Sequence, residues 1–431
     1  MAGEKGVSTS QNPERAILVG IDLGQPQWGP EVSLPELERL ANTAGAVVVG
    51  RVTQRMEHPN PRTFIGSGKA AEVAELCRSL DAQVVILDDE ITPSQQRNLE
   101  SIVPKSVKVI DRTALILDIF GLHATTREGR LQVRLAQNKY LYPRLRGMWA
   151  HLASNRMGGG VGSRFGEGES QLEVDRRMVR KRITSITREL KGVTANRDLQ
   201  RKGRTASTMF RVALAGYTNA GKSSLLNSLT GANILAYDQL FATLDPTTRK
   251  FTLPEGREIT ITDTVGFIQK LPTTLVEAFK STLTETVDAD LILVVVDASD
   301  PQHNAEMDTV SEVLEQIGAS ENPQMTVFNK IDLLSEDERS ALLHRHPDAL
   351  YISARTGEGL VQLVSAISAS AAASSTTVDV LIPYAEGKLV ELAHERGQVL
   401  SEEYGADGTR MLVRVPERIV SRFAPYMVPL D

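Results

Sequence analysis

The sequence predicts an α/β protein built around a P-loop nucleotide-binding domain, with a doubly wound, mostly parallel sheet covered by helices. Three observations predict it. An apolar run over residues 210–215 enters a glycine-bounded loop, residues 216–223, and a helical pattern leaves that loop. Apolar strands and helical patterns alternate along residues 16–110 and again along residues 210–352, as in sheets made of βα units. Between these two parts, helical spacing of apolar residues predicts a long helical hairpin.

The bulk properties fit an ordinary globular protein. The chain has 431 residues, 41% of them hydrophobic, and a net charge of −6, which suits roughly two to four domains. The single cysteine, Cys77, excludes an internal disulfide framework and fits a reducing compartment. The N-terminus lacks the apolar segment of a signal peptide, and the longest aliphatic run, Leu291–Val296, is far shorter than the about 20 residues of a membrane span. We therefore expect a cytoplasmic protein without a membrane span.

Pattern and composition divide the chain into six segments. They are a disordered tail (1–15), an N-terminal α/β domain (16–122), a basic helical hairpin with a glycine-rich tip (123–205), the nucleotide domain (206–371), a small-residue linker (372–377) and a small C-terminal α/β domain (378–431). In the N-terminal domain, Gly66-Ser67-Gly68-Lys69 could be a second phosphate loop or an ordinary strand-to-helix turn. It lacks the spacing of a Walker A motif, which favours the turn.

The loop at residues 216–224 has the glycine spacing of a phosphate-binding loop. Its glycines let successive backbone N–H groups point at a triphosphate, and the following helix adds the positive end of its dipole. Lys222 is expected to reach the β- and γ-phosphates, and the Ser223 hydroxyl to ligate Mg²⁺. The residues assigned to this part of the nucleotide site are Gly216, Tyr217, Thr218, Asn219, Ala220, Gly221, Lys222, Ser223 and Ser224.

A second motif, Asp263-Thr264-Val265-Gly266, follows the predicted strand over residues 258–262. Asp263 would hold Mg²⁺ through a water molecule, and the Gly266 N–H would contact the γ-phosphate. Hydrolysis would therefore depend on Lys222 and Gly266, together with a switch threonine for which the residues alone leave several candidates.

Two further motifs, Asn329-Lys330-Ile331-Asp332 and Ser353-Ala354-Arg355, point to guanine. The Asp332 carboxylate can accept from guanine N1–H and the 2-amino group, whereas adenine offers neither donor there. Asn329 would tie this loop to the phosphate loop, and the Ala354 N–H would meet guanine O6. Four motifs in this order within about 140 residues predict a GTPase that binds GTP and GDP.

The predicted hairpin is strongly basic. Two amphipathic helices, around residues 131–152 and 179–193, flank a glycine-rich connection at residues 158–169 that we expect to be mobile. From Arg144 to Arg204 the chain has fifteen Lys or Arg against six Asp or Glu. A basic helix can be only a solvated face, but this excess in an acidic chain favours an RNA backbone, which arginine binds bidentately or by stacking. The residues assigned to RNA are Arg156, Arg164, Arg176, Arg177, Arg180, Lys181 and Arg182.

The domain order and several motifs resemble the HflX family of ribosome-associated GTPases, over nearly the whole chain. The matching motifs are Gly158-Gly159-Gly160-Val161-Gly162-Ser163-Arg164, Gln171-Leu172-Glu173-Val174-Asp175-Arg176-Arg177, Phe241-Ala242-Thr243-Leu244-Asp245-Pro246-Thr247-Thr248-Arg249, Asp263-Thr264-Val265-Gly266-Phe267 and Leu271-Pro272. One departure lies near the tip, where the family carries Gly-Pro-Gly-Glu and this chain has Phe165-Gly166-Glu167-Gly168-Glu169.

The resemblance implies functions that composition and spacing do not reach. It implies binding to the large ribosomal subunit and its 23S-type rRNA, with the tip near the peptidyl-transferase region, and separation of stalled or idle ribosomes into subunits, often under stress. It also assigns Phe241, Ala242, Thr243, Leu244 and Asp245 to the nucleotide site. Thr243 becomes the switch threonine on Mg²⁺, whereas from the residues alone Thr247 and Thr248 are equal candidates.

Two positions bear on the hydrolysis rate. Phe267 stands where Ras-like enzymes have the glutamine that orients water, so we expect slow intrinsic turnover that a ribosome raises. Asn219 stands where potassium-stimulated GTPases carry an asparagine that helps to ligate the cation; it would hold K⁺ or only shape the loop.

The sequence leaves the biological role open. Ribosome splitting, ribosome assembly and ribosome storage remain alternatives, as do a signalling switch with a protein partner and an RNA-remodelling ATPase that uses the N-terminal domain. We expect a monomer.

Overall fold

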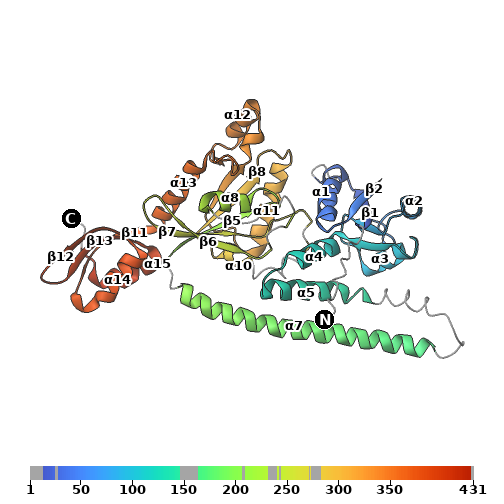
Figure 1. Cartoon of the computed structure of the whole chain (residues 1–431), viewed down its shortest axis with the longest axis horizontal. Coiled ribbons are helices and arrows are strands. Elements are labelled where there is room, and N and C mark those ends of the chain that lie inside the picture. Colours follow the sequence, from blue (N-terminus) through green and yellow to red (C-terminus); the bar gives the residue numbers. More distant parts are fainter. Residues whose placement is uncertain are drawn as a thin grey trace, which may run out of the picture. The chain divides into compact units, whose positions relative to one another are not determined.

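The computed structural model describes residues 13–24, 28–145, 164–205, 209–231, 240–241, 244–270, 272 and 283–428 (Figure 1). The chain forms two compact units. The N-terminal unit comprises Met1–Leu190, Asp238–Ala242 and Lys270–Phe279, and the nucleotide unit comprises Lys191–Tyr237, Thr243–Gln269 and Lys280–Asp431. The division differs from the predicted one in three ways. Two short segments of the predicted nucleotide domain join the N-terminal unit, and the C-terminal sheet joins the nucleotide domain. The predicted hairpin is divided, because its residues 191–205 belong to the nucleotide unit.

The N-terminal unit contains a four-stranded parallel sheet in the order β2-β1-β3-β4. Its elements are β1 (Arg15–Asp22), α1 (Pro30–Thr43), β2 (Val47–Arg55), α2 (Ser67–Ser79), β3 (Val84–Leu87), α3 (Pro93–Glu100), β4 (Lys108–Asp111), α4 (Arg112–His123) and α5 (Arg127–Leu141). Alternate residues of β1 point to the same face of the sheet. On one face, Ile17, Val19 and Ile21 pack in a hydrophobic core with α2 and α3. Gly66-Ser67-Gly68-Lys69 is the start of α2, where Lys69 pairs with Glu72.

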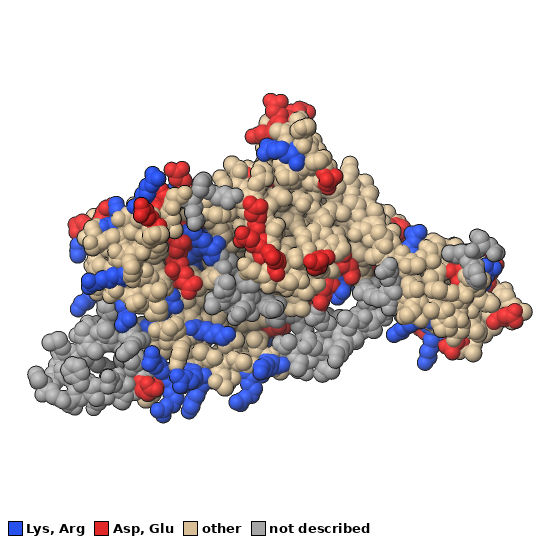
Figure 2. Space-filling view, turned by 180° about the vertical axis from the view of Figure 1, so that it is seen from behind, with Lys and Arg blue, Asp and Glu red and all other residues tan. Residues whose placement is uncertain are grey.

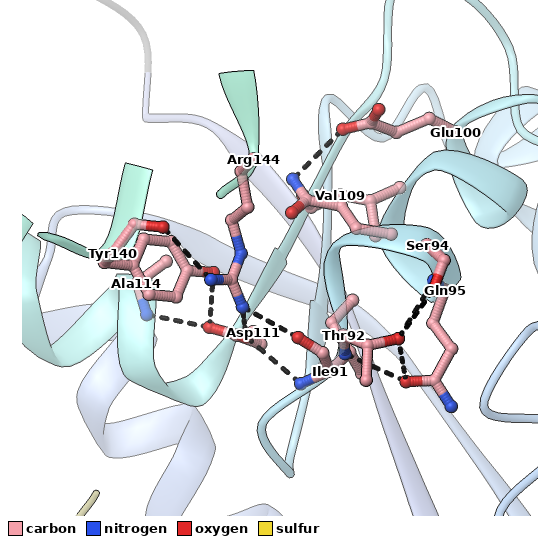
Figure 3. A network of polar contacts seen from close by, with 11 residues as sticks. Ile91, Thr92, Ser94, Gln95, Glu100, Val109, Asp111, Ala114, Tyr140 and Arg144 are labelled. Atoms are coloured by element: carbon pink, nitrogen blue, oxygen red, sulfur yellow. Dashed lines mark hydrogen bonds and ion pairs between the residues drawn. The ribbon is translucent and has the colours of Figure 1, made fainter. Parts of the chain in front are cut away.

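A polar network fixes the C-terminal end of α5 to this sheet (Figure 3). The Asp111 carboxylate caps α4 by accepting from the Ala114 N–H at 2.9 Å, and it also accepts from the Tyr140 hydroxyl at 2.8 Å and from Arg144 Nη2 at 3.2 Å. The same Arg144 nitrogen donates to the Ile91 carbonyl at 2.7 Å, and the guanidinium carbon lies 3.5 Å from the centre of the Tyr140 ring. The side chains of Arg144 and Asp111 are both buried, so α5 is firmly attached to the N-terminal sheet.

The second helix of the predicted hairpin is α7 (Arg164–Thr205), 42 residues long. Residues 146–163, with the first half of the glycine-rich connection, lie outside the described residues. The prediction for residues 164–169 was wrong, because these residues form the first turns of α7 instead of a mobile connection. The predicted apolar stripe of α7, from Val179 to Val193, is half-buried. Within the N-terminal unit, α7 pairs with α5 through Arg127 and Glu189, whose side chains approach to 2.6 Å.

The nucleotide unit contains a six-stranded sheet in the order β10-β9-β8-β5-β7-β6, in which only β6 is antiparallel to its neighbour. Its elements are β5 (Phe210–Gly216), α8 (Lys222–Thr230), β6 (Thr247–Thr252), β7 (Glu258–Asp263), α10 (Thr284–Val287), β8 (Leu291–Asp297), α11 (His303–Ile317), β9 (Gln324–Asn329), the 3₁₀ turn η1 (Ile331–Leu333), α12 (Glu336–Arg345), β10 (Leu350–Tyr351) and α13 (Leu360–Ala373). The central strands β5 and β8 are apolar and buried on both faces, as parallel strands between helices are. The carboxyl ends of the parallel strands lie at one edge of the sheet, and the predicted nucleotide motifs are at that edge.

The C-terminal part is a three-stranded antiparallel sheet in the order β11-β13-β12, with two helices packed on it. Its elements are β11 (Ser375–Ile382), η2 (Tyr384–Glu386), α14 (Gly387–Arg396), β12 (Gln398–Tyr404), β13 (Thr409–Pro416), α15 (Glu417–Phe423) and η3 (Ala424–Tyr426). Two differences from prediction stand out. The predicted linker 372–377 forms the end of α13 and the start of β11. The sequence pattern predicts strands near 378–382 and 411–415 and a helix near 387–397, but neither β12 nor α15. Throughout the described ranges, no helix is long and apolar enough to cross a membrane.

Candidate functional site

The loop between β5 and α8 has the backbone of a phosphate-binding loop. Gly221 has a φ of 92°, and a Cβ atom there would come within 2.2 Å of Asn329 Nδ2, so only glycine fits. A Cβ atom on Gly216 would come within 2.2 Å of the Val295 carbonyl oxygen on the neighbouring strand β8. Asn219 also has a left-handed backbone, with a φ of 63°, and its side chain is exposed. Both predicted glycines are therefore required by close contacts.

Lys222, the first residue of α8, is buried. Its Nζ donates to the backbone carbonyls of Gly216 at 3.1 Å and Tyr217 at 2.7 Å, so the ammonium lies inside the loop that it would share with phosphates. Burial lowers the pKa of Lys222 to about 8, against the opposing effects of the Asp263 and Glu306 carboxylates. Bound phosphates would supply the negative charge that favours the ammonium form.

Ser223 and Asp263, two residues predicted to hold Mg²⁺, lie next to each other. The Ser223 hydroxyl donates to Asp263 Oδ2 at 2.6 Å, which brings the end of β7 to the start of α8. A hydroxyl and a carboxylate are hard oxygen ligands of the kind that Mg²⁺ prefers, so the residues present fit this ion. Thr243, the third predicted ligand, lies outside the described residues, as does Ala242.

The Asp263–Gly266 segment is held against the phosphate loop. The Thr218 N–H donates to the Phe267 carbonyl at 2.8 Å, and the Phe267 N–H donates to the Gly216 carbonyl at 3.1 Å. A Cβ atom on Gly266 would come within 2.9 Å of Thr218 Cα and 3.1 Å of Lys222 Nζ. Gly266 is thus adjacent to the lysine that would bind the γ-phosphate.

The predicted base-binding residues also come together. Asn329 Nδ2 donates to the Ala220 carbonyl at 2.9 Å, while Asn329 Oδ1 accepts from the Ala354 N–H at 2.9 Å. The N–H expected to meet guanine O6 therefore donates to Asn329 in this structure. Asp332 accepts from the Ser353 hydroxyl at 2.5 Å and forms an ion pair with Arg355, and these contacts, led by the Ser353 hydrogen bond, lower the pKa of Asp332. Asp332 is thus held as a carboxylate, the form that could accept from guanine.

Two partners in this site were missed by sequence reasoning. Lys330 forms an ion pair at 2.6 Å with Asp297, the last residue of β8. The Tyr217 hydroxyl accepts from the Gln269 N–H at 2.8 Å and so links the phosphate loop to the segment after Gly266. The position of Asp297, at the carboxyl end of a strand adjacent to β9, was the available signal.

The remaining predicted nucleotide residues lie apart from these contacts or are only partly described. Leu244 is buried in the nucleotide unit, whereas Phe241 belongs to the N-terminal unit, where its ring packs on Phe120. The residues predicted to bind RNA are described in part. On α7, one of them is half-buried, Arg176, and four are exposed: Arg177, Arg180, Lys181 and Arg182. Figure 2 shows the basic side chains gathered along this helix at the lower edge of the molecule. The Arg180 side chain contacts the Tyr142 hydroxyl, Arg156 lies outside the described residues, and no side-chain position is described for Arg164.

Together, the sheet order, the phosphate loop and the guanine-type motifs define a P-loop GTPase. Family descriptions match along most of the chain: "GTP-binding GTPase N-terminal" at residues 31–121, "GTP-binding GTPase Middle Region" at residues 123–204 and "50S ribosome-binding GTPase" at residues 211–330. GTPase HflX of Lacrimispora saccharolytica is 45% identical over 412 residues, which cover 95% of this chain and 96% of that protein. GTPase HflX of Escherichia coli is 42% identical over 406 residues, 94% of each chain.

A solved GTP-binding protein from Sulfolobus solfataricus, in complex with GDP, is similar with a TM-score of 0.43 and 22% identity, over 83% of this chain and 98% of that one. The chain belongs to the HflX family of GTPases. GTP hydrolysis is its reaction.

Proposed function

We propose that this GTPase binds the large ribosomal subunit through the basic face of α7, contacts 23S-type rRNA there, and separates stalled or idle ribosomes into subunits in the cytoplasm. Mg²⁺ held by Ser223 and Thr243, and by Asp263 through a water molecule, would serve GTP hydrolysis, with Lys222 and Gly266 at the γ-phosphate. GTP would favour the ribosome-bound form and GDP the released form.

The observation that carries this proposal is the division of α7 into two faces. Its apolar stripe is half-buried, while Arg177, Lys181 and Arg182 project from the exposed side. The stripe is partly shielded from solvent, and the exposed cations are left for an external partner. A phosphate backbone matches such a row, and arginine can also stack on exposed RNA bases. The description of the family matched at residues 211–330 names the 50S ribosome, which agrees with this choice of partner.

Co-sedimentation with purified large subunits tests the proposal. The protein is loaded with a GTP analogue or GDP and sedimented over a salt series. We expect binding that prefers the GTP analogue and weakens steeply with salt, since each phosphate contact adds a slope of about 0.7–0.9 in log K against log salt. Replacement of Arg177, Lys181 and Arg182 by Glu should abolish sedimentation and flatten that slope.

A matched control reverses three exposed cations elsewhere in the N-terminal unit, Arg55, Arg78 and Lys105. Binding by this control should equal that of the native protein. If both triple variants bind alike, α7 is not the RNA-binding face. Binding that is independent of salt would instead favour a protein partner, as in a signalling switch.

The same subunits test the catalytic part of the proposal. Native turnover should be slow and rise when large subunits are added, and a rate unaffected by them would contradict the ribosomal role.

Potassium stimulation is a separate question. The left-handed backbone at Asn219 favours asparagine whether or not a cation is bound, so equal rates in potassium and sodium buffers would assign Asn219 to loop shape alone.

A further inference from the structure

Two described residues in or beside the nucleotide motifs belong to the N-terminal unit. Phe241 opens the Phe-Ala-Thr-Leu-Asp-Pro motif, and Lys270 follows Gly266 by four positions. Both have left-handed backbones, with φ values of 60° and 53°. Bulky residues adopt this conformation rarely, and they keep it where surrounding contacts fix it. The side-chain contacts of Phe241 and Lys270 therefore show which part of the protein holds the chain at these two positions.

Lys270 is bound by two adjacent carboxylates that follow β3. Its Nζ lies 2.7 Å from Asp88 Oδ2 and 2.7 Å from Asp89 Oδ1. The Asp88 side chain is only 2% exposed, and it also accepts from Arg112 Nη1 at 2.7 Å. Arg112, 1% exposed, forms a second ion pair with buried Glu36. Lys270 thus supplies a second cation to a buried cluster of carboxylates, and loss of one partner from such a cluster leaves an uncompensated charge.

Phe241 makes the second attachment. Its ring lies 4.6 Å from the ring of Phe120 on α4, at an interplanar angle of 70°, which is a favourable edge-to-face arrangement. Both rings are buried. Phe241, at the start of the Phe-Ala-Thr-Leu-Asp-Pro motif, and Lys270, beyond the Asp263–Gly266 motif, are therefore fixed to the same unit by unrelated contacts, one apolar and one ionic.

The buried cluster is continuous with the attachment of the helical arm. Arg112, which binds Asp88, is the first residue of α4, and the preceding residue, Asp111, is its N-cap. Asp111 binds Tyr140 and Arg144 near the end of α5 (Figure 3). Two ion pairs and one peptide bond therefore separate Lys270 from the residues that hold α5 in place.

We propose that Lys270 is a positioning residue that couples the nucleotide state to the basic arm. When Gly266 contacts the γ-phosphate, Lys270 holds Asp88 and Asp89 and supplies the second positive charge of the cluster. When the γ-phosphate is lost, the segment after Gly266 moves, Lys270 leaves, and the cluster that supports α4 and α5 loosens. Coupling between two sites is reciprocal, so RNA bound to the arm would favour GTP by the same factor. The link to RNA rests on the proposed function; the link between Lys270 and the cluster does not.

Hydrogen exchange on the isolated protein tests the coupling without ribosomes. Peptides covering residues 88–92 and 111–118 are compared in complexes with a GTP analogue and with GDP. The native protein should exchange more slowly in these peptides with the GTP analogue. Lys270→Met should abolish this difference while both nucleotides still bind, and Lys270→Arg, which keeps the charge, should restore it. A Lys270→Met protein that keeps the full difference would overturn the proposal.

Lys69 offers a matched control in the same unit. It too forms an ion pair at 2.7 Å, and its side chain is 26% exposed against 29% for Lys270, but its partner Glu72 is half exposed. Lys69→Met should leave the exchange difference unchanged. Phe241→Leu provides a second variant without a change of charge, in case Lys270→Met does not fold. It should reduce the difference, and an undiminished difference would contradict the proposal.

Large-subunit binding gives the second readout. The native ratio of affinities with GTP analogue and GDP should be about fivefold or more, in the usual range for coupled sites, and Lys270→Met should bring it close to one. A native protein that binds no large subunits contradicts the proposed function, and the exchange experiment then decides the coupling alone. A Lys270→Met protein that binds with the native ratio contradicts the coupling and leaves the proposed function intact.

Discussion

The side-chain amide of Asn329 donates to the carbonyl oxygen of Ala220 at 2.9 Å and so joins the base-binding loop to the phosphate loop. Its other end accepts from the Ala354 N–H at 2.9 Å. Asn329 is 2% exposed, and the close approach of its amide excludes any side chain at Gly221. One buried side chain therefore positions three separate loops of the nucleotide site.

Asn329→Asp should weaken GTP binding by tenfold or more. The change keeps the shape but removes the donor to Ala220, and an unmade buried hydrogen bond costs about 1–3 kcal/mol, more where a charge is buried. Titration with a fluorescent GTP analogue measures the affinity. Asn322→Asp is the control, because the Asn322 amide also donates to two carbonyls, of Val287 and Ala289, away from the nucleotide motifs. It should lower the melting temperature and leave the affinity unchanged; equal losses of affinity would contradict the role given to Asn329.

Asp332→Asn should reduce GTP affinity by about a hundredfold and raise affinity for xanthosine triphosphate. The amide cannot accept from both guanine donors, but it can donate to the 2-carbonyl of xanthine. Competition binding with both nucleotides measures the change. The matched control is Asp379→Asn in the C-terminal sheet, since each carboxylate pairs with an arginine and the two are 10% and 12% exposed. A shift in base preference in the control, or none in Asp332→Asn, would contradict the assignment.

The affinity for GTP should fall as pH rises above 8. The pKa of Lys222 is about 8 in the protein without nucleotide because the ammonium is buried, whereas bound phosphates favour the charged form. Binding then takes up a proton, and the linkage predicts an affinity about fourfold lower at pH 8.5 than at pH 7. Calorimetry in two buffers of different ionisation enthalpy measures the proton directly. Lys222→Arg should show no such pH dependence, because a guanidinium stays charged in this range.

The grouping of the candidate site residues could be predicted from sequence, because these residues occur in short motifs in a fixed order. All five predicted residues lie at or after the carboxyl ends of strands that meet at one edge of the sheet, so their proximity followed from the order of strands and helices: Lys222, Ser223, Asp263, Asn329 and Asp332. The N-terminal sheet followed from alternation in the same way.

Other features depend on contacts between distant segments, and no local pattern reveals those. The pairing of Lys270 with Asp88 joins residues 182 positions apart. The helix α7 starts at Arg164 despite two glycines in its first turns, although those glycines predict a mobile tip. The strand β12 was missed because its alternation is weak and it lies at the edge of a small sheet.

Phe267→Gln should not accelerate hydrolysis, although it restores the residue type that Ras-like enzymes use. The Phe267 side chain is 1% exposed, and its backbone is fixed to the phosphate loop through Gly216 and Thr218. A glutamine at this position would be buried away from the attacking water, so it would lose apolar packing and leave an amide without partners. We expect a loss of stability of about 2–4 kcal/mol. Single-turnover hydrolysis and thermal unfolding measure the two effects. Phe267→Leu, which stays apolar, should hydrolyse GTP at the native rate and lose less stability. Faster hydrolysis by the glutamine variant than by the leucine variant would show that the side chain at 267 reaches the water, and the slow intrinsic rate would then follow from the missing amide alone.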